Sequence, residues 1–183
     1  MRKNVYMTSI IRATEKDYIT IINIGKESVT EAHKDSCDSE ILNEFIERNY
    51  NDDAIKKELS EQNNIYYIIN YNDQPIGFSK IIFNVTHPNI ARKNIAKLDR
   101  IYLLKEFHGI KLGFELLKFN IELSKSNNQS GLWLFTWTGN KRAIDFYLNA
   151  GFTIIGSHNF HVAKTHYNPN HHMFLDFSKN ESK

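Results

Sequence analysis

The sequence predicts an α/β (α+β) fold, in which a mixed, mostly antiparallel, six- to seven-stranded sheet carries helices on both faces. Runs of β-branched and aromatic residues at 65–70, 76–85 and 131–136 are typical of strands. Apolar residues within 41–46 lie at helical spacing and indicate an amphipathic helix. No repeat or low-complexity linker divides the chain, so we expect a single domain over residues 1–183.

The chain begins with a short predicted strand and a helical region. Residues 9–13 form the strand. Thr14 and Asp17 resemble an N-capping pair that opens a helix over roughly residues 16–34. The polar segment 38–61 has apolar residues on one helical face, first near its start and again near its end. We therefore expect two short helices there.

A hairpin and a further strand follow. Residues 65–70 and 76–85 are the two arms, and the turn signal at 71–75 joins them. Residues 86–94 read as a loop, and the strand at 96–104 comes next. The remaining predicted elements are a helix from Lys111, a strand at 131–136, a helix at 140–150, and strands near 152–163 and 171–177.

Two features of the second half of the chain predict a particular backbone geometry. Gly151 suits the left-handed position that follows a helix C-terminus. The strand, helix and strand across residues 96–136 form a crossover unit, which we expect to be right-handed.

Composition excludes several classes of function. Hydrophobic residues make up 41% and charged residues 24% of the chain, as in ordinary globular proteins. The formal net charge is +2, with basic and acidic residues interspersed, which argues against nucleic-acid or membrane partners. The one cysteine, Cys37, excludes an internal disulfide framework and a thiolate metal cluster. No run of 18 apolar residues occurs, so we expect a cytoplasmic protein.

The most informative stretch is Leu98 to Leu117, LDRIYLLKEFHGIKLGFELL. It joins a predicted strand to a helix through a turn that contains Gly109 and Gly113. Such a turn directs unpaired backbone N–H groups toward one point at a helix N-terminus, where an anion can bind. By spacing alone, an ordinary strand-to-helix turn with a packing glycine fits equally well.

The segment His108-Gly109-Ile110-Lys111-Leu112-Gly113 resembles the acetyl-CoA motif (Gln/Arg)-x-x-Gly-x-(Gly/Ala) of the GNAT superfamily of N-acetyltransferases. His108 replaces the usual Gln or Arg, and Lys111 replaces the central glycine, so we expect Lys111 to adopt a helical φ. A second stretch, residues 131–156, resembles the next motif of the family more closely. Its matching residues are Asn140, Ala143, Phe146, Tyr147, Gly151, Phe152 and Gly156.

The resemblance covers roughly residues 8–177 and implies a sheet that splays between the strands at 98–104 and 131–136. The pantetheine arm of acetyl-CoA would insert there and pair with strand backbone at Ile101 and Leu103. A backbone N–H could polarise the thioester carbonyl. The implied cofactor-binding residues are Ile101, Tyr102, Leu103, His108, Gly109, Ile110, Lys111, Leu112, Gly113, Phe114, Asn140 and Ala143, with the pyrophosphate at residues 108–114.

The resemblance gives Tyr147 the role of catalytic acid, which would protonate the departing thiolate. A phenol suits this role because its unperturbed pKa near 10 keeps it protonated at neutral pH. Without the motif, Tyr147 reads as an aromatic packing residue on an amphipathic helix.

The amine needs a group that removes its proton. The candidate bases are Asp99, Glu27, Glu31, Glu44 and Glu47. Asp99 shares strand parity with the cofactor-lining Ile101 and Leu103, although an Asp at a strand start can equally face solvent. Glu27 and Glu31 on the first predicted helix would suit a cationic substrate, although exposed helix acids are commonly only a solvated face.

Five histidines near the C-terminus raise the question of a metal site: His158, His161, His166, His171 and His172. Their spacing matches no ligand pattern. Surface or loop histidines explain the cluster, and we predict no metal.

The sequence thus predicts acetyl transfer from acetyl-CoA to a small primary amine by direct attack. Cys37 has no evident base partner, which argues against a covalent thiol route. The general pattern most resembles the bacterial polyamine (spermidine/spermine) branch of the family. Acetylation of a protein N-terminus or an aminoglycoside, and a non-catalytic acyl-CoA-binding module, remain alternatives. The resemblance also allows a homodimer.

Overall fold

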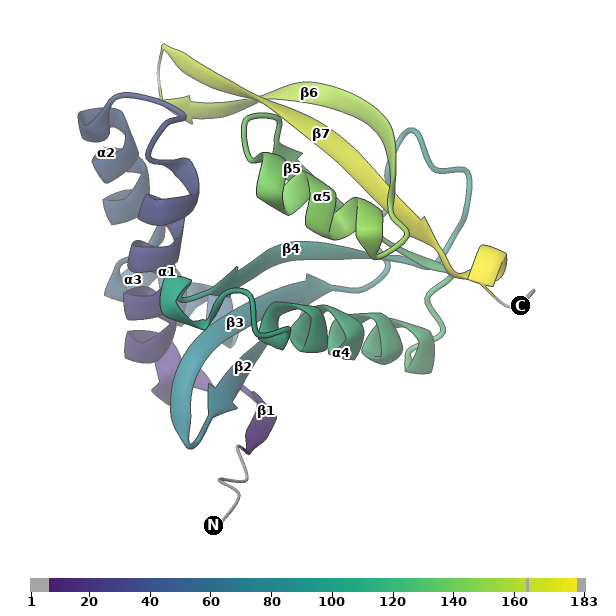
Figure 1. The fold of residues 1–183 in the computed structure, drawn as a ribbon, viewed down its shortest axis with the longest axis horizontal. Helices are drawn as coiled ribbons and strands as arrows, with labels where there is room; N and C mark the ends of the chain where they lie inside the picture. The colour runs from purple at the N-terminus through teal and green to yellow at the C-terminus, as the bar shows by residue number, and fades with distance from the viewer. Residues whose placement is uncertain (1–6, 164, 181–183) are drawn as a thin grey trace.

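A computed structural model describes residues 7–163 and 165–180 (Figure 1). Its strands form one seven-stranded sheet in the order β1-β2-β3-β4-β5-β7-β6. Only β4 and β5 are parallel neighbours, and the other pairs are antiparallel, which confirms the predicted mixed sheet. The strands are β1 (Thr8–Arg12), β2 (Ile65–Tyr71), β3 (Gln74–Ile82), β4 (Ile95–Leu103), β5 (Gly131–Trp137), β6 (Thr153–Ala163) and β7 (His166–Asp176).

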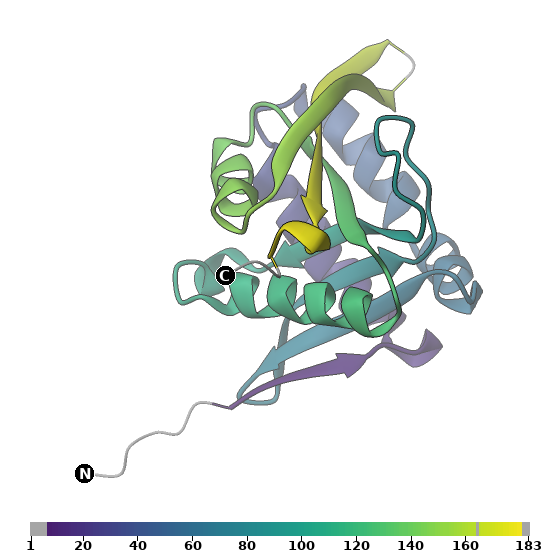
Figure 2. The same cartoon turned by 90° about the vertical axis from the view of Figure 1, so that its right-hand side faces the viewer.

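Helices cover both faces of the sheet, as predicted (Figures 1 and 2). Three of them, α1, α2 and α3, pack on one face, whereas α4 and α5 pack on the other. The α-helices are α1 (Tyr18–His33), α2 (Ser39–Asn49), α3 (Asp52–Ser60), α4 (Leu112–Ser126) and α5 (Lys141–Asn149). Single 3-10 turns are η1 (Glu15–Asp17), η2 (Lys105–Phe107) and η3 (Phe177–Asn180).

The predicted capping pair at the start of the first helix is confirmed. The Thr14 hydroxyl accepts a hydrogen bond from the backbone N–H of Lys16 at 3.3 Å, and a carboxylate oxygen of Asp17 accepts one from the backbone N–H of Thr14 at 2.7 Å. These bonds satisfy donors that the first turn would leave unpaired. The first turn is the 3-10 turn η1, after which α1 continues as an α-helix.

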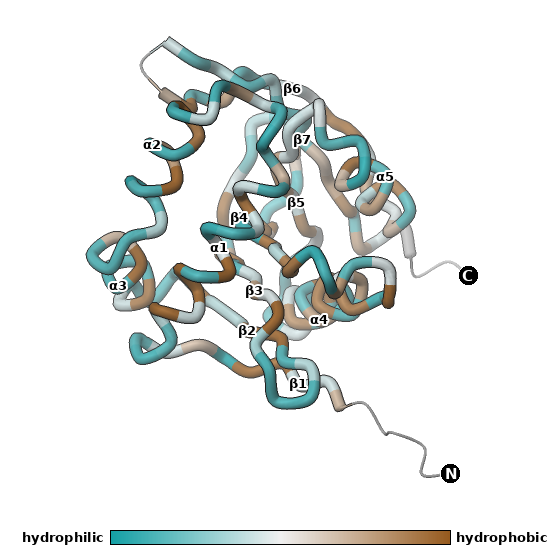
Figure 3. Tube along the Cα trace, turned by 60° about the vertical axis from the view of Figure 1, so that its left-hand side comes forward, coloured by the Kyte–Doolittle hydropathy of each residue, from teal (hydrophilic) through white to brown (hydrophobic). Residues whose placement is uncertain are grey.

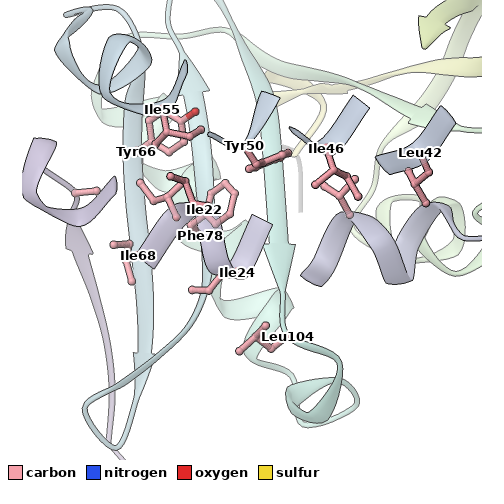
Figure 4. Packing of buried hydrophobic residues seen from close by; sticks show 13 residues of the cluster. Ile22, Ile24, Leu42, Ile46, Tyr50, Ile55, Tyr66, Ile68, Phe78 and Leu104 are labelled. Atoms are coloured by element: carbon pink, nitrogen blue, oxygen red, sulfur yellow. The ribbon is translucent and has the colours of Figure 1, made fainter. Parts of the chain in front are cut away.

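The face that carries α1–α3 holds a continuous apolar cluster. Apolar segments alternate with polar ones along these helices, as one buried and one exposed face require (Figure 3). In Figure 4, Ile22 of α1 lies against Phe78 of β3, and Ile55 of α3 lies beside Tyr66 of β2. Burial of each such side chain contributes about 1.5–3 kcal/mol. This core fixes α1 and α2 relative to β4.

The opposite face carries two clusters beneath α4 and α5. Leu116 of α4 packs with Ile69 and Ile76 near the start of the helix. Leu117 of α4 and Tyr147 of α5 share a second cluster with residues of β3, β4, β5 and β7. The two helices are thereby fixed on either side of the junction between β4 and β5.

The parallel pair β4–β5 separates after three residues. Paired positions run from Ile95 opposite Gly131 to Lys97 opposite Trp133. Beyond them, residues 98–103 of β4 and 134–137 of β5 have no strand partner on their facing sides. This confirms the predicted splay and leaves backbone N–H and C=O groups open to a bound molecule.

A β-bulge at Asp99 changes the facing of β4. Arg100 pairs with Lys80, but Leu98 pairs with Ile81, so Asp99 is an extra residue on its strand. After the bulge, Ile101 packs on the α4 side, whereas the Asp99 carboxylate meets Lys80 and Lys97 on the opposite side. The expectation that Asp99 faces the same side as Ile101 and Leu103 is therefore wrong, because strict alternation does not hold across a bulge.

Candidate active site

A cavity of about 810 Å³ lies at the splay between β4 and β5. Elements from both halves of the chain line it, including α1, α2, β4, the start of α4, β5, α5, β6 and β7. It brings together most of the residues that the sequence singled out: Glu31, Asp99, Ile101, Tyr102, Leu103, His108, Gly109, Lys111, Gly113, Phe114, Asn140, Ala143 and Tyr147.

Three of the residues predicted to bind the cofactor or the acceptor do not line the cavity. Ile110 and Glu27 are exposed on the surface. Leu112 is 5% exposed and packs in the core with Leu116. Leu112 can still contribute its backbone N–H, because it is the first residue of α4.

The turn before α4 contains two left-handed residues. Gly109 has φ +82°, and Lys111 has φ +69°. The expectation of a helical φ at Lys111 is therefore wrong. Lys111 is the N-cap residue of α4, so the turn enters the helix through a left-handed residue and not through a helical one. A side chain in that conformation costs about 1–2 kcal/mol, which a glycine at the same position avoids.

The N-terminus of α4 offers unpaired amides to this turn. The backbone N–H of Glu115 bonds to the carbonyl of Lys111 at 3.0 Å, which is the first bond of the helix. The preceding N–H groups of residues 112–114 have no intrahelical acceptor, and the helix dipole is positive at this end. Together with the cationic side chain of Lys111, the site fits a diphosphate.

His108 ties the end of β4 to the start of α5. The Arg142 guanidinium contacts Nδ1 of His108, and Nε2 of His108 lies 2.9 Å from the Leu103 carbonyl. Because guanidinium only donates, Nδ1 is the acceptor and Nε2 carries the proton that bonds to Leu103. Burial lowers the pKa of His108, and the nearby Arg142 charge lowers it further. His108 is therefore neutral, and Arg142 is held beside the turn that precedes α4.

Asn140 caps α5 with its side chain. Its Oδ1 atom accepts from the backbone N–H of Ala143 at 3.1 Å. The cap fixes the amide at the cavity wall. Within residues 7–163 and 165–180, the Nδ2 group of Asn140 has no acceptor, so it is free to donate into the cavity.

Tyr147 lies at the cavity wall between two aromatic rings. It is 8% exposed, with its ring centroid 5.2 Å from that of Phe146 and 5.5 Å from that of Phe152. Burial raises its pKa, and the nearby Tyr102 raises it further. In the described part of the chain, the Tyr147 hydroxyl has no hydrogen-bond partner. A protonated phenol with an unused O–H therefore faces the cavity.

Asp99 is part of a network of buried charges. Its carboxylate lies 2.6 Å from the Nζ atom of Lys97 and 3.2 Å from that of Lys80. Burial alone would raise the pKa of Asp99, but the charges of Lys97, Lys80 and Arg100 hold it below its ordinary value. The carboxylate is therefore ionised at neutral pH and compensated by two ammonium groups.

The network continues through Glu58 of α3, which the sequence analysis did not identify. Glu58 accepts hydrogen bonds from Lys80 at 2.6 Å, from the Tyr66 hydroxyl at 2.6 Å and from Arg100 at 2.8 Å. The sequence did contain an indication of such a residue. Lys80 and Arg100 are charged residues in the middle of apolar strands, and buried charges require partners of opposite charge. Glu58 anchors β3 and β4 to α3.

His33, the last residue of α1, is a second lining residue that the sequence analysis missed. Its ring centroid lies 5.8 Å from that of Trp137 at the cavity wall. Burial lowers the pKa of His33, so the ring is neutral at neutral pH. A neutral imidazole can accept a proton.

Three histidines form a hydrogen-bonded row on β6, β7 and the loop before β4. The N–H of Asn89 donates to Nδ1 of His87 at 3.1 Å, so Nε2 of His87 carries the proton that bonds to Nδ1 of His172 at 2.9 Å. Nε2 of His172 in turn donates to Nδ1 of His158 at 2.8 Å. The five histidines of the predicted cluster lie on β6 and β7 and not in loops, and the rings of His158 and His172, which are partly exposed, contact that of Phe135.

Among the described residues, no group of three or more His, Cys, Asp or Glu side chains is placed so that it could hold a metal ion. The row of histidines uses its ring nitrogens in hydrogen bonds to one another. Of the other histidines in the predicted cluster, His166 bonds to the Ser36 carbonyl and to Asn168.

The carboxylates proposed for substrate recognition are mostly paired or remote. Glu31 lines the cavity, but it lies 2.9 Å from the Nζ atom of Lys105 and 3.5 Å from that of Lys34. Glu47 is exposed and pairs with Lys26 at 2.7 Å. Glu27 and Glu44 are exposed outside the lining.

Comparisons with known proteins identify the family of the chain. A family model described as "Acetyltransferase (GNAT) family" matches residues 27–152. A protein of Lactobacillus delbrueckii subsp. lactis, described as an uncharacterized N-acetyltransferase, is 27% identical over 151 residues, which cover 82% of this chain and 87% of that protein.

Solved structures share the fold. The PaiA N-acetyltransferase of Thermoplasma acidophilum, determined in complex with coenzyme A, matches with a TM-score of 0.75 at 19% identity over 93% of this chain and 99% of that one. The ribosomal-protein-S18-alanine N-acetyltransferase of Escherichia coli matches with a TM-score of 0.68 at 15% identity, over 93% and 94% of the two chains. In the part of the chain that the structure describes, no helix has the length and apolar character needed to span a membrane.

Proposed function

The chain belongs to the acetyltransferase (GNAT) family and is an acetyl-CoA-dependent N-acetyltransferase, and on this premise we propose that it acetylates a small primary amine by direct attack in the cavity between β4 and β5. The observation that carries the proposal is the position of Tyr147. Tyr147 lines the same cavity as the open backbone of β4, and its hydroxyl has no hydrogen-bond partner among the residues that the structure describes.

The residues of the cavity fit acetyl-CoA from one end to the other. The amides of residues 112–114, Lys111 and Arg142 suit the diphosphate, because they combine unpaired donors with positive charge. The unpaired backbone of residues 98–103 suits the amide groups of the pantetheine arm, which would pair with it as an added strand does. The free Nδ2 group of Asn140 suits a carbonyl of that arm.

Bound acetyl-CoA supplies an activated acetyl group, and the residues of the chain stabilise its transfer. As the amine nitrogen bonds to the carbonyl carbon, negative charge grows on the carbonyl oxygen. A backbone N–H near Ile101 or Leu103 that bonds to this oxygen would lower the barrier by about 3 kcal/mol. When the carbon–sulfur bond breaks, Tyr147 donates its proton to the sulfur.

The attacking amine must lose a proton, and two lining residues are candidates. Asp99 is the acceptor that the sequence predicts, either directly or through a water molecule, and its two lysine partners keep it ionised. His33 is the second candidate, because its neutral ring lies in the same wall. A carboxylate with a lowered pKa is the weaker base of the two, but it is available over a wider pH range.

Direct attack is supported by the position of the cysteine. Cys37 does not line the cavity, and its sulfur lies 3.7 Å from the Ser36 hydroxyl. No cysteine therefore faces the cavity within residues 7–163 and 165–180. An acetylated thiol intermediate has no candidate there.

The finer prediction, a polyamine acceptor, receives little support from the charges of the lining. A polyamine carries several ammonium groups, and each needs a carboxylate when it leaves water. In the described lining the only carboxylates, Glu31 and Asp99, each pair with two lysines. The homodimer and the cytoplasmic location also remain predictions.

Release of free coenzyme A tests the proposed function. The protein is incubated with acetyl-CoA and a panel of primary amines, and the new thiol is measured with a chromogenic thiol reagent. Mass spectrometry should show one added acetyl group on the amine. Binding of acetyl-CoA without thiol release for any amine would contradict the proposal and favour a non-catalytic acyl-CoA-binding module.

A further inference from the structure

The part of the cavity that the cofactor residues leave open contains two unsatisfied polar atoms. These are the Oγ atom of Ser28 and the Oδ1 atom of Asn170, which are buried and have no hydrogen-bond partner within residues 7–163 and 165–180. Ser28 is 6% exposed. A buried polar atom without a partner costs about 1–3 kcal/mol, and such atoms are few in native proteins. Both residues line the same cavity, so both atoms can form hydrogen bonds to a ligand bound there.

The environment of each atom strengthens this conclusion. A serine inside a helix usually bonds back to a carbonyl one turn earlier, but Ser28 of α1 does not. Two other asparagines of this region, Asn49 and Asn168, each make a hydrogen bond. Asn49 donates to the Phe45 carbonyl at 2.7 Å, and Asn168 bonds to His166 at 2.9 Å. Asn170 differs from both in that its Oδ1 atom is buried and has no partner among the described residues.

The walls around these atoms are apolar and aromatic. They come from α2, β5 and β6, and not from the turn that precedes α4. The rings of Phe45 and Phe160 meet edge to face at a centroid distance of 6.2 Å. The apolar lining residues of this region are Leu42, Phe45, Phe135, Trp137, Phe160 and Val162. Such walls favour a ligand with an apolar or aromatic body.

The charges of the cavity disfavour a ligand with several cations. Lys97 and Arg100 also line it, and they lie beside the Asp99 carboxylate that they compensate. A second ammonium group on the ligand would meet these cations without a free carboxylate to balance it. A single ammonium group on the ligand is easier to accommodate. The amide oxygen of Asn170 or the hydroxyl oxygen of Ser28 can accept a hydrogen bond from it.

We propose that the acceptor is a primary amine on a compact apolar or aromatic body, with no second cationic group, whose N–H or O–H donors bond to Ser28 and Asn170. This assignment rests on the proposed function and names the substrate class of the same site. An arylalkylamine such as tyramine has this chemistry, because its ammonium and phenol groups flank an aromatic ring.

The rates with tyramine, 2-phenylethylamine and spermidine test the assignment. We expect kcat/KM for tyramine to exceed that for spermidine at least tenfold. An equal or higher value for spermidine would overturn the assignment while leaving the proposed function intact. Calorimetric titration of each amine into the protein saturated with coenzyme A separates the two claims further. Tighter binding of tyramine without turnover would support the site and contradict the function, whereas binding of neither amine would overturn the site.

Variants test whether the two polar residues act on the acceptor. Ser28→Ala and Asn170→Ala should each raise KM for tyramine about tenfold, with less than a threefold change in kcat and in acetyl-CoA affinity. Asn23→Ala on α1 and Asn159→Ala on β6 are matched controls, because both side chains are exposed outside the cavity. Asn170→Asp should move the preference toward spermidine by adding a carboxylate. An unchanged KM in folded Ser28→Ala and Asn170→Ala proteins would overturn the role of these residues.

Discussion

The Nζ atom of Lys97 lies 2.6 Å from a carboxylate oxygen of Asp99, two positions further along β4, at the wall of the cavity. Side chains at such positions share one face of a regular strand, and the bulge at Asp99 does not separate this pair. Lys80 approaches the same carboxylate at 3.2 Å from β3. The two lysines keep Asp99 ionised, but they also make it a weaker base. The pH dependence of kcat should show this.

The pH dependence of kcat at saturating amine distinguishes Asp99 from His33 as the base. With Asp99 as the base, we expect kcat to stay constant from about pH 8 to pH 5, because the pKa of Asp99 lies below its ordinary value near 4. Asp99→Asn should then lower kcat about a hundredfold, since an amide cannot accept the proton.

His33→Gln provides the comparison for this prediction. With Asp99 as the base, it should change kcat less than threefold. A fall of kcat in wild-type protein below about pH 6.5 that disappears in His33→Gln would instead assign the base to His33. Thermal unfolding of Asp99→Asn must be measured alongside, because the variant leaves Lys80 and Lys97 with less compensating charge.

Tyr147→Phe should lower kcat about a hundredfold and leave acetyl-CoA affinity within about twofold. The ring keeps its packing against Phe146 and Phe152, so only the proton donor is lost. Because the pKa of Tyr147 is raised, wild-type kcat should show no loss of the acid up to about pH 9.5. Stopped-flow thiol release and titration with acetyl-CoA measure the two quantities. Tyr167→Phe, at an exposed tyrosine, is the control, and unchanged kcat in Tyr147→Phe would remove this residue from the mechanism.

Lys111→Gly should stabilise the fold, because glycine adopts the left-handed φ of +69° without a steric cost. Part of the relief is offset by the greater freedom of glycine in the unfolded chain, so we expect a gain of roughly 0.5–1 kcal/mol, or about 2–3 °C in Tm. Lys111→Ala keeps the unfavourable φ and should give no gain. Both variants should bind acetyl-CoA more weakly if Lys111 contacts the diphosphate. Equal Tm values for the two variants would contradict the strain at this position.

The sequence predicted the elements of the fold well because local chemistry determines them. The apolar spacing in α2 and α3, the capping pair at Thr14 and Asp17, and the left-handed Gly151 all concern residues a few positions apart. The motifs at residues 108–113 and 140–147 likewise consist of local spacings, and they lie at one cavity in the structure.

Features that depend on distant partners could not be predicted in this way. The bulge at Asp99 arises from the pairing of β3 with β4, and alternation within β4 alone gives the wrong face. No sequence pattern distinguishes Ser28 and Asn170. What sets them apart is that, in the folded structure, one polar atom of each is buried without a hydrogen-bond partner among the described residues. The row of His87, His158 and His172 joins three segments that only the sheet brings together.

This row of histidines should make stability depend on pH. Burial lowers the pKa of His87, His158 and His172, and the charge of Lys97 lowers that of His158 further. The unfolded chain therefore binds more protons than the folded one once pH falls below the unfolded value near 6.5. Stability from the neutral rings is fully present above pH 6.5, and it is lost as pH falls toward the folded pKa values.

Urea unfolding at pH 7.5, 6.5 and 5.5 measures this effect. A second proton on any ring of the row places its new N–H against an N–H of the neighbouring histidine or of Asn89. Protonation in acid therefore breaks a hydrogen bond and also places a charge on a partly buried ring. His172→Gln removes the central ring and should reduce the loss of unfolding free energy between pH 7.5 and 5.5 relative to wild type. His161→Gln, at an exposed histidine outside the row, should leave that loss unchanged. If His172→Gln and wild type lose the same free energy over this range, the row does not govern the acid sensitivity of the fold.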